Sequence, residues 1–183
     1  MKPKWWNKAK KQLSKRDIVM KKLLSVYKGH LTTRNNFFYS LTRSIISQQI
    51  SVSAADSVFS KFEKKCRGKI NPKIVSKLSI TDLRRCGLSR MKALGIKSLA
   101  DKILDKSFNP KLIKKMSDEE AINYLSTLRQ IGRWSSEMVL IFFYNRPNIW
   151  PVQDIGLLRA ISNNYNKKYL PPKSFVNKLQ KKF

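Results

Sequence analysis

One acidic residue, Asp154, follows a proline-marked turn and precedes an apolar helical pattern in the stretch NIWPVQDIGLLRA, residues 148–160. The chain has 11 aspartates and glutamates against 39 lysines and arginines, so an acid kept at this point needs a physical reason. An aspartate before a helix can cap it, because its side-chain oxygen accepts a bond from a first-turn amide. A carboxylate in a water-poor site can also stabilise positive charge that develops during a reaction. Spacing alone favours the cap, and the two roles are compatible.

A second candidate site is the turn within LSTLRQIGRWSSEMVL, which joins two predicted helices. The first helix is expected to end at Leu128, a tight turn to follow at residues 130–132, and a buried helix to begin near Trp134. This arrangement is a helix–hairpin–helix. Its outward backbone N–H groups would form an anion site suited to a phosphate of DNA, and Arg129 and Arg133 flank it.

The charge of the whole chain also points to a polyanionic partner. The net charge is +28 over 183 residues, and nucleic acid is the partner that such an excess favours, because each phosphate that is neutralised releases counterions. Part of the lysine excess is typical of an AT-rich genome, and the lysines form no tail, so charge alone specifies no site. The hydrophobic content of 42% indicates a folded domain.

The sequence argues against several other classes of protein. The chain has two cysteines, Cys66 and Cys86, and no CxxC spacing. A zinc site, an iron–sulfur cluster and a disulfide framework are therefore not expected. No stretch reaches 18 apolar residues, and the basic start lacks the apolar run of a signal peptide. We therefore expect a soluble protein in a reducing compartment with no membrane partner.

The elements that must position these residues are predicted to be helices. Runs of alternating β-branched residues between Asn-Gly turns are absent, so the expected fold class is all-α, with nine or ten short helices. Apolar residues recur at three- and four-residue steps, several behind a serine that can cap the helix, in segments 37–50, 53–62, 79–88, 88–104, 117–128 and 135–144.

Four motifs in a fixed order resemble one family. Two lie upstream, LTRSIISQQISVSAA and CGLSRMKALGIKSLA, and two surround the hairpin and Asp154. The matching residues of the last two are Leu128, Ile131, Gly132, Trp134, Glu137, Arg146, Pro147, Pro151, Asp154, Gly156 and Leu157. Together the motifs cover most of residues 12–165 and resemble the helix–hairpin–helix–Gly/Pro–Asp (HhH-GPD) DNA glycosylases, most closely the 3-methyladenine DNA glycosylase II type.

The resemblance implies a fold and a reaction. It implies one glycosylase domain over residues 1–183, with two helical lobes and a cleft between them. Residues 1–35 and the C-terminal end would form one lobe, and about 36–150 the other. The implied function is base-excision repair by hydrolysis of the N-glycosidic bond of alkylated purines such as 3-methyladenine and 7-methylguanine, after the nucleotide is flipped out of double-stranded DNA.

The resemblance also implies roles for individual residues. Asp154 would be catalytic, stabilising an oxocarbenium-like transition state. Trp134 occupies the position of the Schiff-base lysine of bifunctional relatives, so we expect no strand cleavage by that route, and its ring would stack on a cationic base. The other residues that it implies are Met138, Tyr39 and Trp150 for the base pocket, and Gln48, Gln49, Ile131, Gly132, Arg129 and Arg133 for DNA binding.

No cofactor is expected to be required. The resemblance implies at most a structural K⁺ or Na⁺ held by the main-chain carbonyls of Ser126, Leu128 and Ile131. It further implies a monomer in the bacterial cytosol and nucleoid.

Alternative interpretations stay open at this point. Trp134, Trp150 and Tyr39 could be core residues, and Gln49 an exposed residue of a helix. The alternative function is a non-catalytic helix–hairpin–helix DNA-binding protein. Gln130 replaces the first hairpin glycine of the family, at a position that usually needs a conformation glycine adopts easily, and the family's C-terminal Trp-x-Pro-x-Arg-Ser-x-Ala pattern is not found.

Overall fold

The protein is helical throughout the part of the chain that the computed structural model describes, residues 2–32 and 34–183. These residues form eleven α-helices and one 3-10 helix, without a strand. The predicted all-α class is confirmed. The helices outnumber the expected nine or ten partly because the four-residue α5 is too short to leave an apolar repeat in the sequence.

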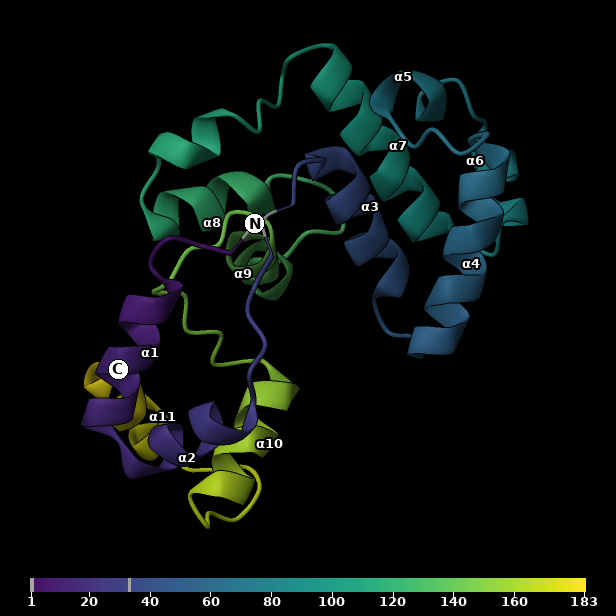
Figure 1. Ribbon diagram of the computed structural model, residues 1–183. Coiled ribbons are helices and arrows are strands. Elements are labelled where there is room, and N and C mark those ends of the chain that lie inside the picture. The colour runs from purple at the N-terminus through teal and green to yellow at the C-terminus, as the bar shows by residue number, and fades with distance from the viewer. Residues whose placement is uncertain (1, 33) are drawn as a thin grey trace. The chain divides into compact units, whose positions relative to one another are not determined.

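The chain divides into two compact units, shown in Figure 1. Unit 1 comprises residues 2–32 and Leu140–Phe183, and unit 2 comprises Arg34–Val139. The helices of unit 1 are α1 (Trp6–Arg16), α2 (Ile18–Val26), α10 (Ile155–Asn164) and α11 (Lys173–Lys182). Unit 2 holds α3 (Phe37–Ser47), α4 (Val52–Lys65), α5 (Pro72–Val75), α6 (Ile80–Arg85), α7 (Arg90–Leu104), η1 (Leu112–Lys115) and α8 (Asp118–Ser126), and α9 (Arg133–Phe142) begins in it.

Serine caps fix where the helices of unit 2 begin. Ser51, Ser79, Ser89 and Ser117 each accept a bond from a backbone N–H three residues later. The predicted capping box of Ser117 and Glu120 is confirmed, because Glu120 also accepts the Ser117 N–H at 2.7 Å. Each such cap stabilises its helix by about 1 kcal/mol.

Helix α7 organises the core of unit 2. It contacts α3, α5 and α6, and α3 pairs with α4, as Figure 1 shows. The predicted apolar stripes face this core, whose largest fully buried side chains include Phe62, Leu41, Ile45, Leu83, Ile96, Leu99 and Leu125. Helix α9 was expected to be buried all round, but it is buried on one side only, since Trp134 and Phe142 are exposed. The second side of α9 is therefore available for contacts beyond the core.

Asp17 joins the two chain segments of unit 1. It lies between α1 and α2, is 5% exposed, and caps α2 by accepting the Met20 N–H at 2.8 Å. It also accepts bonds from Tyr165 Oη at 3.0 Å and Lys182 Nζ at 2.6 Å. Burial opposes the carboxylate, but the bonds from Lys182, the Met20 amide and Tyr165 outweigh it and lower the pKa of Asp17. One buried acid thus links α2 to α10 and α11.

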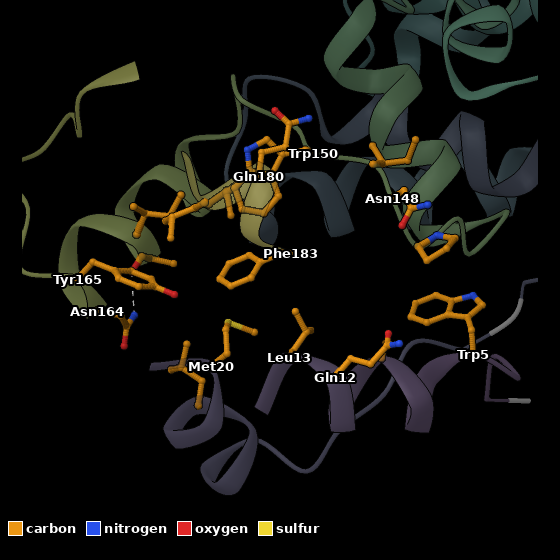
Figure 2. Close-up of a pocket in the computed structure, with 18 of the residues that line it drawn as sticks. Trp5, Gln12, Leu13, Met20, Asn148, Trp150, Asn164, Tyr165, Gln180 and Phe183 are labelled. Atoms are coloured by element: carbon orange, nitrogen blue, oxygen red, sulfur yellow. Dashed lines mark hydrogen bonds between the residues drawn. The ribbon is translucent and has the colours of Figure 1, made fainter. Parts of the chain in front are cut away.

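A cavity of about 820 Å³ lies beside this link, within unit 1. Figure 2 shows Leu13 and Met20 pointing into it from one side and Phe183 from the other. Trp150 also lines it, with its ring centroid 6.0 Å from that of Phe183.

None of the helices in residues 2–32 and 34–183 has the length and apolar character that a membrane-spanning helix needs.

Candidate active site and nucleic-acid interface

The predicted hairpin is present between α8 and α9. The Ile131 N–H donates to the Leu128 carbonyl at 3.1 Å, and both side chains are buried, which fixes the turn onto unit 2. Gly132 is exposed, and a Cβ added to it would meet nothing within 4 Å. The backbone at the start of α9 is therefore open to a ligand that seeks N–H donors.

Gln130 adopts the backbone conformation that glycine favours. Its φ is +68°, in the left-handed region. Its side chain lies against α7 at Gly95: a Cβ added to Gly95 would stand 2.8 Å from Gln130 Cγ and 3.2 Å from the Arg129 carbonyl oxygen. The missing side chain at residue 95 thus makes the space that the extra side chain at residue 130 needs.

Gly95→Ala is expected to destabilise the protein by about 1–3 kcal/mol, because the added methyl overpacks the hairpin. In a Gln130→Gly background the same change should cost less, because the contacts with the Gln130 side chain are gone and only the 3.2 Å contact with the Arg129 carbonyl oxygen remains. Urea unfolding of the four proteins measures the coupling between the two sites. An equal cost of Gly95→Ala in both backgrounds would show that the two positions do not interact.

The two arginines beside the hairpin are in different surroundings. Arg133 donates from Nη1 and Nη2 to Glu119 at 2.9 and 2.6 Å, and its Nε lies 3.2 Å from Glu137 Oε1. Arg129 is exposed, and its Nη2 lies 3.7 Å from the sulfur of Met91. Two carboxylates therefore offset the charge of Arg133, whereas Arg129 bonds a neutral sulfur.

Glu137, a residue of the sequence motif, is the buried acid of this group. Its exposed fraction is 3%. Burial raises the pKa of Glu137, and the nearby Arg133 opposes that effect. The exposed Glu119 has a lowered pKa, because Arg133 bonds to its ionised form. The Arg133 side chain thus braces α8 against the first turns of α9.

The two glutamines after α3 have distinct positions. Gln48 donates from Nε2 to the Gln130 carbonyl at 2.8 Å and to Ser135 Oγ at 3.3 Å, so its amide braces the hairpin. Gln49 is exposed, with a φ of +58°. It lies in a turn after the end of α3, not in a helix as the alternative interpretation assumed.

The predicted base-pocket residues are divided between the units. In unit 2, Trp134 at the start of α9 is 39% exposed, so the core interpretation of this residue is wrong, and Met138 one turn later is partly buried. Tyr39 packs edge-on against Phe59, with ring centroids 5.2 Å apart. In unit 1, Trp150 packs on the core cluster that includes Ile161 and lines the cavity of Figure 2.

Asp154 caps α10 in unit 1, as its spacing predicted. Its Oδ1 accepts the Leu157 N–H at 2.7 Å, and its own N–H donates to the Pro151 carbonyl at 2.9 Å. A Cβ added to Gly156 would lie 3.0 Å from Asp154 Oδ1. The proline turn and the small residue two positions on together fix this half-buried carboxylate.

The hairpin carbonyls proposed to hold a cation belong to Ser126, Leu128 and Ile131. The Leu128 carbonyl accepts the Ile131 N–H, and a carbonyl oxygen has a second lone pair that can face a cation. Among the described residues no group of three or more His, Cys, Asp or Glu side chains could hold a metal ion. A main-chain K⁺ or Na⁺ site remains a prediction.

Comparisons with known proteins explain why these motifs occur together. Residues 42–183 match the profile of the HhH-GPD superfamily base excision DNA repair proteins. The chain belongs to this superfamily. It is 31% identical over 148 residues to the Schizosaccharomyces pombe alkylbase DNA glycosidase-like protein mag2, a match that covers 79% of this chain and 70% of that protein. It is 29% identical to DNA-3-methyladenine glycosylase 1 of the same yeast, over 77% of this chain and 63% of the relative.

A solved structure extends the likeness to the fold. Schizosaccharomyces pombe 3-methyladenine DNA glycosylase (Mag1), in complex with abasic DNA, superposes with a TM-score of 0.79 at 28% identity. The match covers 96% of this chain and 88% of Mag1. The helix–hairpin–helix glycosylase fold inferred from the four motifs is confirmed.

Sequence reasoning missed the role of Gly95. A glycine inside a helical pattern costs stability relative to alanine and often marks a close approach, so Gly95 carried a usable signal. The side-chain bond from Gln48 to the hairpin left no such signal, because it joins residues 82 positions apart.

Proposed function

We propose that this HhH-GPD protein is a monofunctional DNA glycosylase that releases alkylated purines, including 3-methyladenine and 7-methylguanine, from double-stranded DNA. The observation that carries the proposal is Asp154. By the motif resemblance it matches the family's catalytic aspartate, and the Pro151 turn and the first turn of α10 hold it in place. The curated relatives named DNA-3-methyladenine glycosylase support the choice of substrate.

The chemistry assigned to Asp154 is electrostatic. Breaking the bond between base and deoxyribose leaves positive charge on the sugar. A carboxylate fixed beside that charge stabilises it without having to reorganise, and it can orient the attacking water. Oδ1 is already held by the Leu157 amide, so the carboxylate keeps one orientation before substrate arrives.

Trp134 supports the choice of a cationic base and of simple hydrolysis. An indole has no amine that could form an imine with the sugar, so the proposed enzyme has no lyase step through this residue. Its exposed ring can stack on the flipped base, and an aromatic face attracts a cationic purine by roughly 0.5–2 kcal/mol. A base that is already cationic leaves without a general acid.

Release of free base tests the proposal. The protein is incubated with duplex DNA that carries 7-methylguanine or 3-methyladenine, and the supernatant is analysed for the methylated base by chromatography. Release from this DNA and not from unmodified DNA supports the glycosylase. Tight, salt-sensitive DNA binding with no released base would instead support the non-catalytic DNA-binding protein.

Arg129→Gln is expected to reduce the dependence of DNA binding on salt. Each lost phosphate contact lowers the slope of log affinity against log salt concentration by about 1. Arg133→Gln should leave the slope nearly unchanged and instead lower stability, because the Arg133 guanidinium is paired with Glu119 and with the buried Glu137. Fluorescence anisotropy at several salt concentrations separates the two, and equal slopes for both variants would contradict this ranking.

Three further properties belong to the proposal. We expect a monomer in the cytosol, and a K⁺ or Na⁺ at the carbonyls of Ser126, Leu128 and Ile131 that shapes the hairpin. No redox or organic cofactor enters the proposed reaction.

A further inference from the structure

The turn after α3 is tied to α7 by one partly buried amine. Lys92 Nζ donates to the Ile46 carbonyl at 2.8 Å and to the Gln48 carbonyl at 2.6 Å. The last carbonyls of a helix have no partner within the helix, and a cation is favoured beside them. Lys92 therefore satisfies the end of α3 and fixes the first residue of the turn that follows it.

The same turn is tied to the hairpin by the Gln48 side chain, through its bonds to the Gln130 carbonyl and Ser135 Oγ. Gln48 thus has its backbone held by α7 and its amide held by the hairpin. Gln49, the next residue, has a left-handed backbone and an exposed side chain. The position of Gln49 relative to the hairpin is set by this chain of bonds within unit 2.

We propose that Lys92 is a positioning residue for DNA: it locks the Gln48–Gln49 turn and, through the Gln48 amide, holds that turn and the hairpin as one preassembled docking surface. The inference rests on the proposed function only in that DNA is the ligand. Without the lysine, the turn and the hairpin would have to be ordered when DNA binds, and that ordering would weaken binding.

The surroundings of Lys92 favour this role over a contact with DNA. The Lys92 side chain is partly buried, and this burial lowers the pKa of its amine. An amine directed at two carbonyls of its own protein has one remaining N–H. Lys92 therefore acts through other residues.

The test compares Lys92→Met with a matched control, Lys97→Met. Lys97 lies on the same helix and also donates to a backbone carbonyl, that of Ser76, which follows the short α5. Both changes keep the apolar stem and remove one amine that bonds the backbone. Each variant is measured for thermal unfolding, for affinity to lesion-containing duplex DNA, and for KM and kcat of base release.

We expect Lys92→Met to weaken DNA affinity and raise KM by roughly tenfold, with kcat at saturation changed far less. Lys97→Met should keep the wild-type DNA affinity, even if it lowers thermal stability as much as Lys92→Met does. Gln48→Ala should weaken binding too, and the double variant with Lys92→Met should lose less than the sum, because both act on one turn.

Two results would overturn the inference: equal DNA affinity of Lys92→Met and Lys97→Met, or fully additive effects of Lys92→Met and Gln48→Ala. Failure of the proposed function is distinguishable from either. In that case the wild-type protein binds DNA and releases no base, while the affinity comparison still measures the contribution of Lys92 to DNA binding.

Discussion

Asp154→Asn is expected to lower the rate of base release by at least about 10²–10³-fold, the scale of removing one preorganised electrostatic group from a transition state. Asparagine keeps a side-chain oxygen that can accept the Leu157 N–H, so α10 keeps its cap. The negative charge beside the developing oxocarbenium ion is lost. Single-turnover release of 7-methylguanine measures the rate, and anisotropy with the same duplex measures binding.

Two companion variants separate charge from structure. Asp154→Ala removes both charge and cap, so it should lower activity similarly and also destabilise the protein by about 1 kcal/mol. Gly156→Ala keeps the charge but places a methyl 3.0 Å from Oδ1, so it should reduce the rate by displacing the carboxylate. If Asp154→Asn released base at the wild-type rate, Asp154 would have no catalytic role and the proposed mechanism would be wrong.

Asp17→Ala is expected to destabilise the protein by about 2–4 kcal/mol, the combined scale of a lost helix cap and a lost charged hydrogen bond. The change removes the acceptor for the Met20 N–H, Tyr165 Oη and Lys182 Nζ together. The matched variant Lys182→Met removes a partner that is 44% exposed, so it should cost less than about 1 kcal/mol. Urea unfolding at neutral pH measures both, and equal costs would show that Asp17 contributes no more than its surface ion pair.

The same carboxyl group gives a pH dependence with a defined sign. Its pKa is lower in the folded protein than in the unfolded chain, whose value is about 4. The stability that it contributes is therefore complete above about pH 4 and is lost as the pH falls through the folded pKa. The difference in unfolding free energy between wild type and Asp17→Ala should be constant from pH 5 to about pH 7 and should narrow in stronger acid.

Local patterns predicted the parts of the site that local interactions build. Ser117 and Glu120 predicted the start of α8, and the proline turn before an apolar run predicted Asp154 as a cap. The hairpin followed from the end of one apolar repeat and the start of the next. In each case the residues that interact lie within a few positions of one another, so the sequence carries the pattern directly.

The remaining features depend on side chains from distant segments. The resemblance assigned Gln48 to DNA binding, which stays a prediction, and gave no sign that its amide bonds to a hairpin 82 positions away. Arg133 was also assigned to DNA binding, and its ion pair at 2.6 Å with Glu119 of the preceding helix was not predicted. Lys92 lies in the motif CGLSRMKALGIKSLA, but the motif does not show that its amine bonds to the carbonyls at the end of α3. Tertiary packing decides which lysine or glutamine bonds to a distant segment, and a local sequence pattern does not show that packing.

The contact between Gly95 and Gln130 also bears on which substitutions this protein can accept. A Cβ at residue 95 would lie 2.8 Å from Gln130 Cγ, so one of the two side chains would have to shift. A side chain at residue 95 should therefore be accepted more readily where residue 130 is glycine. The pair should accordingly vary together, and a chain with side chains at both positions should be rare.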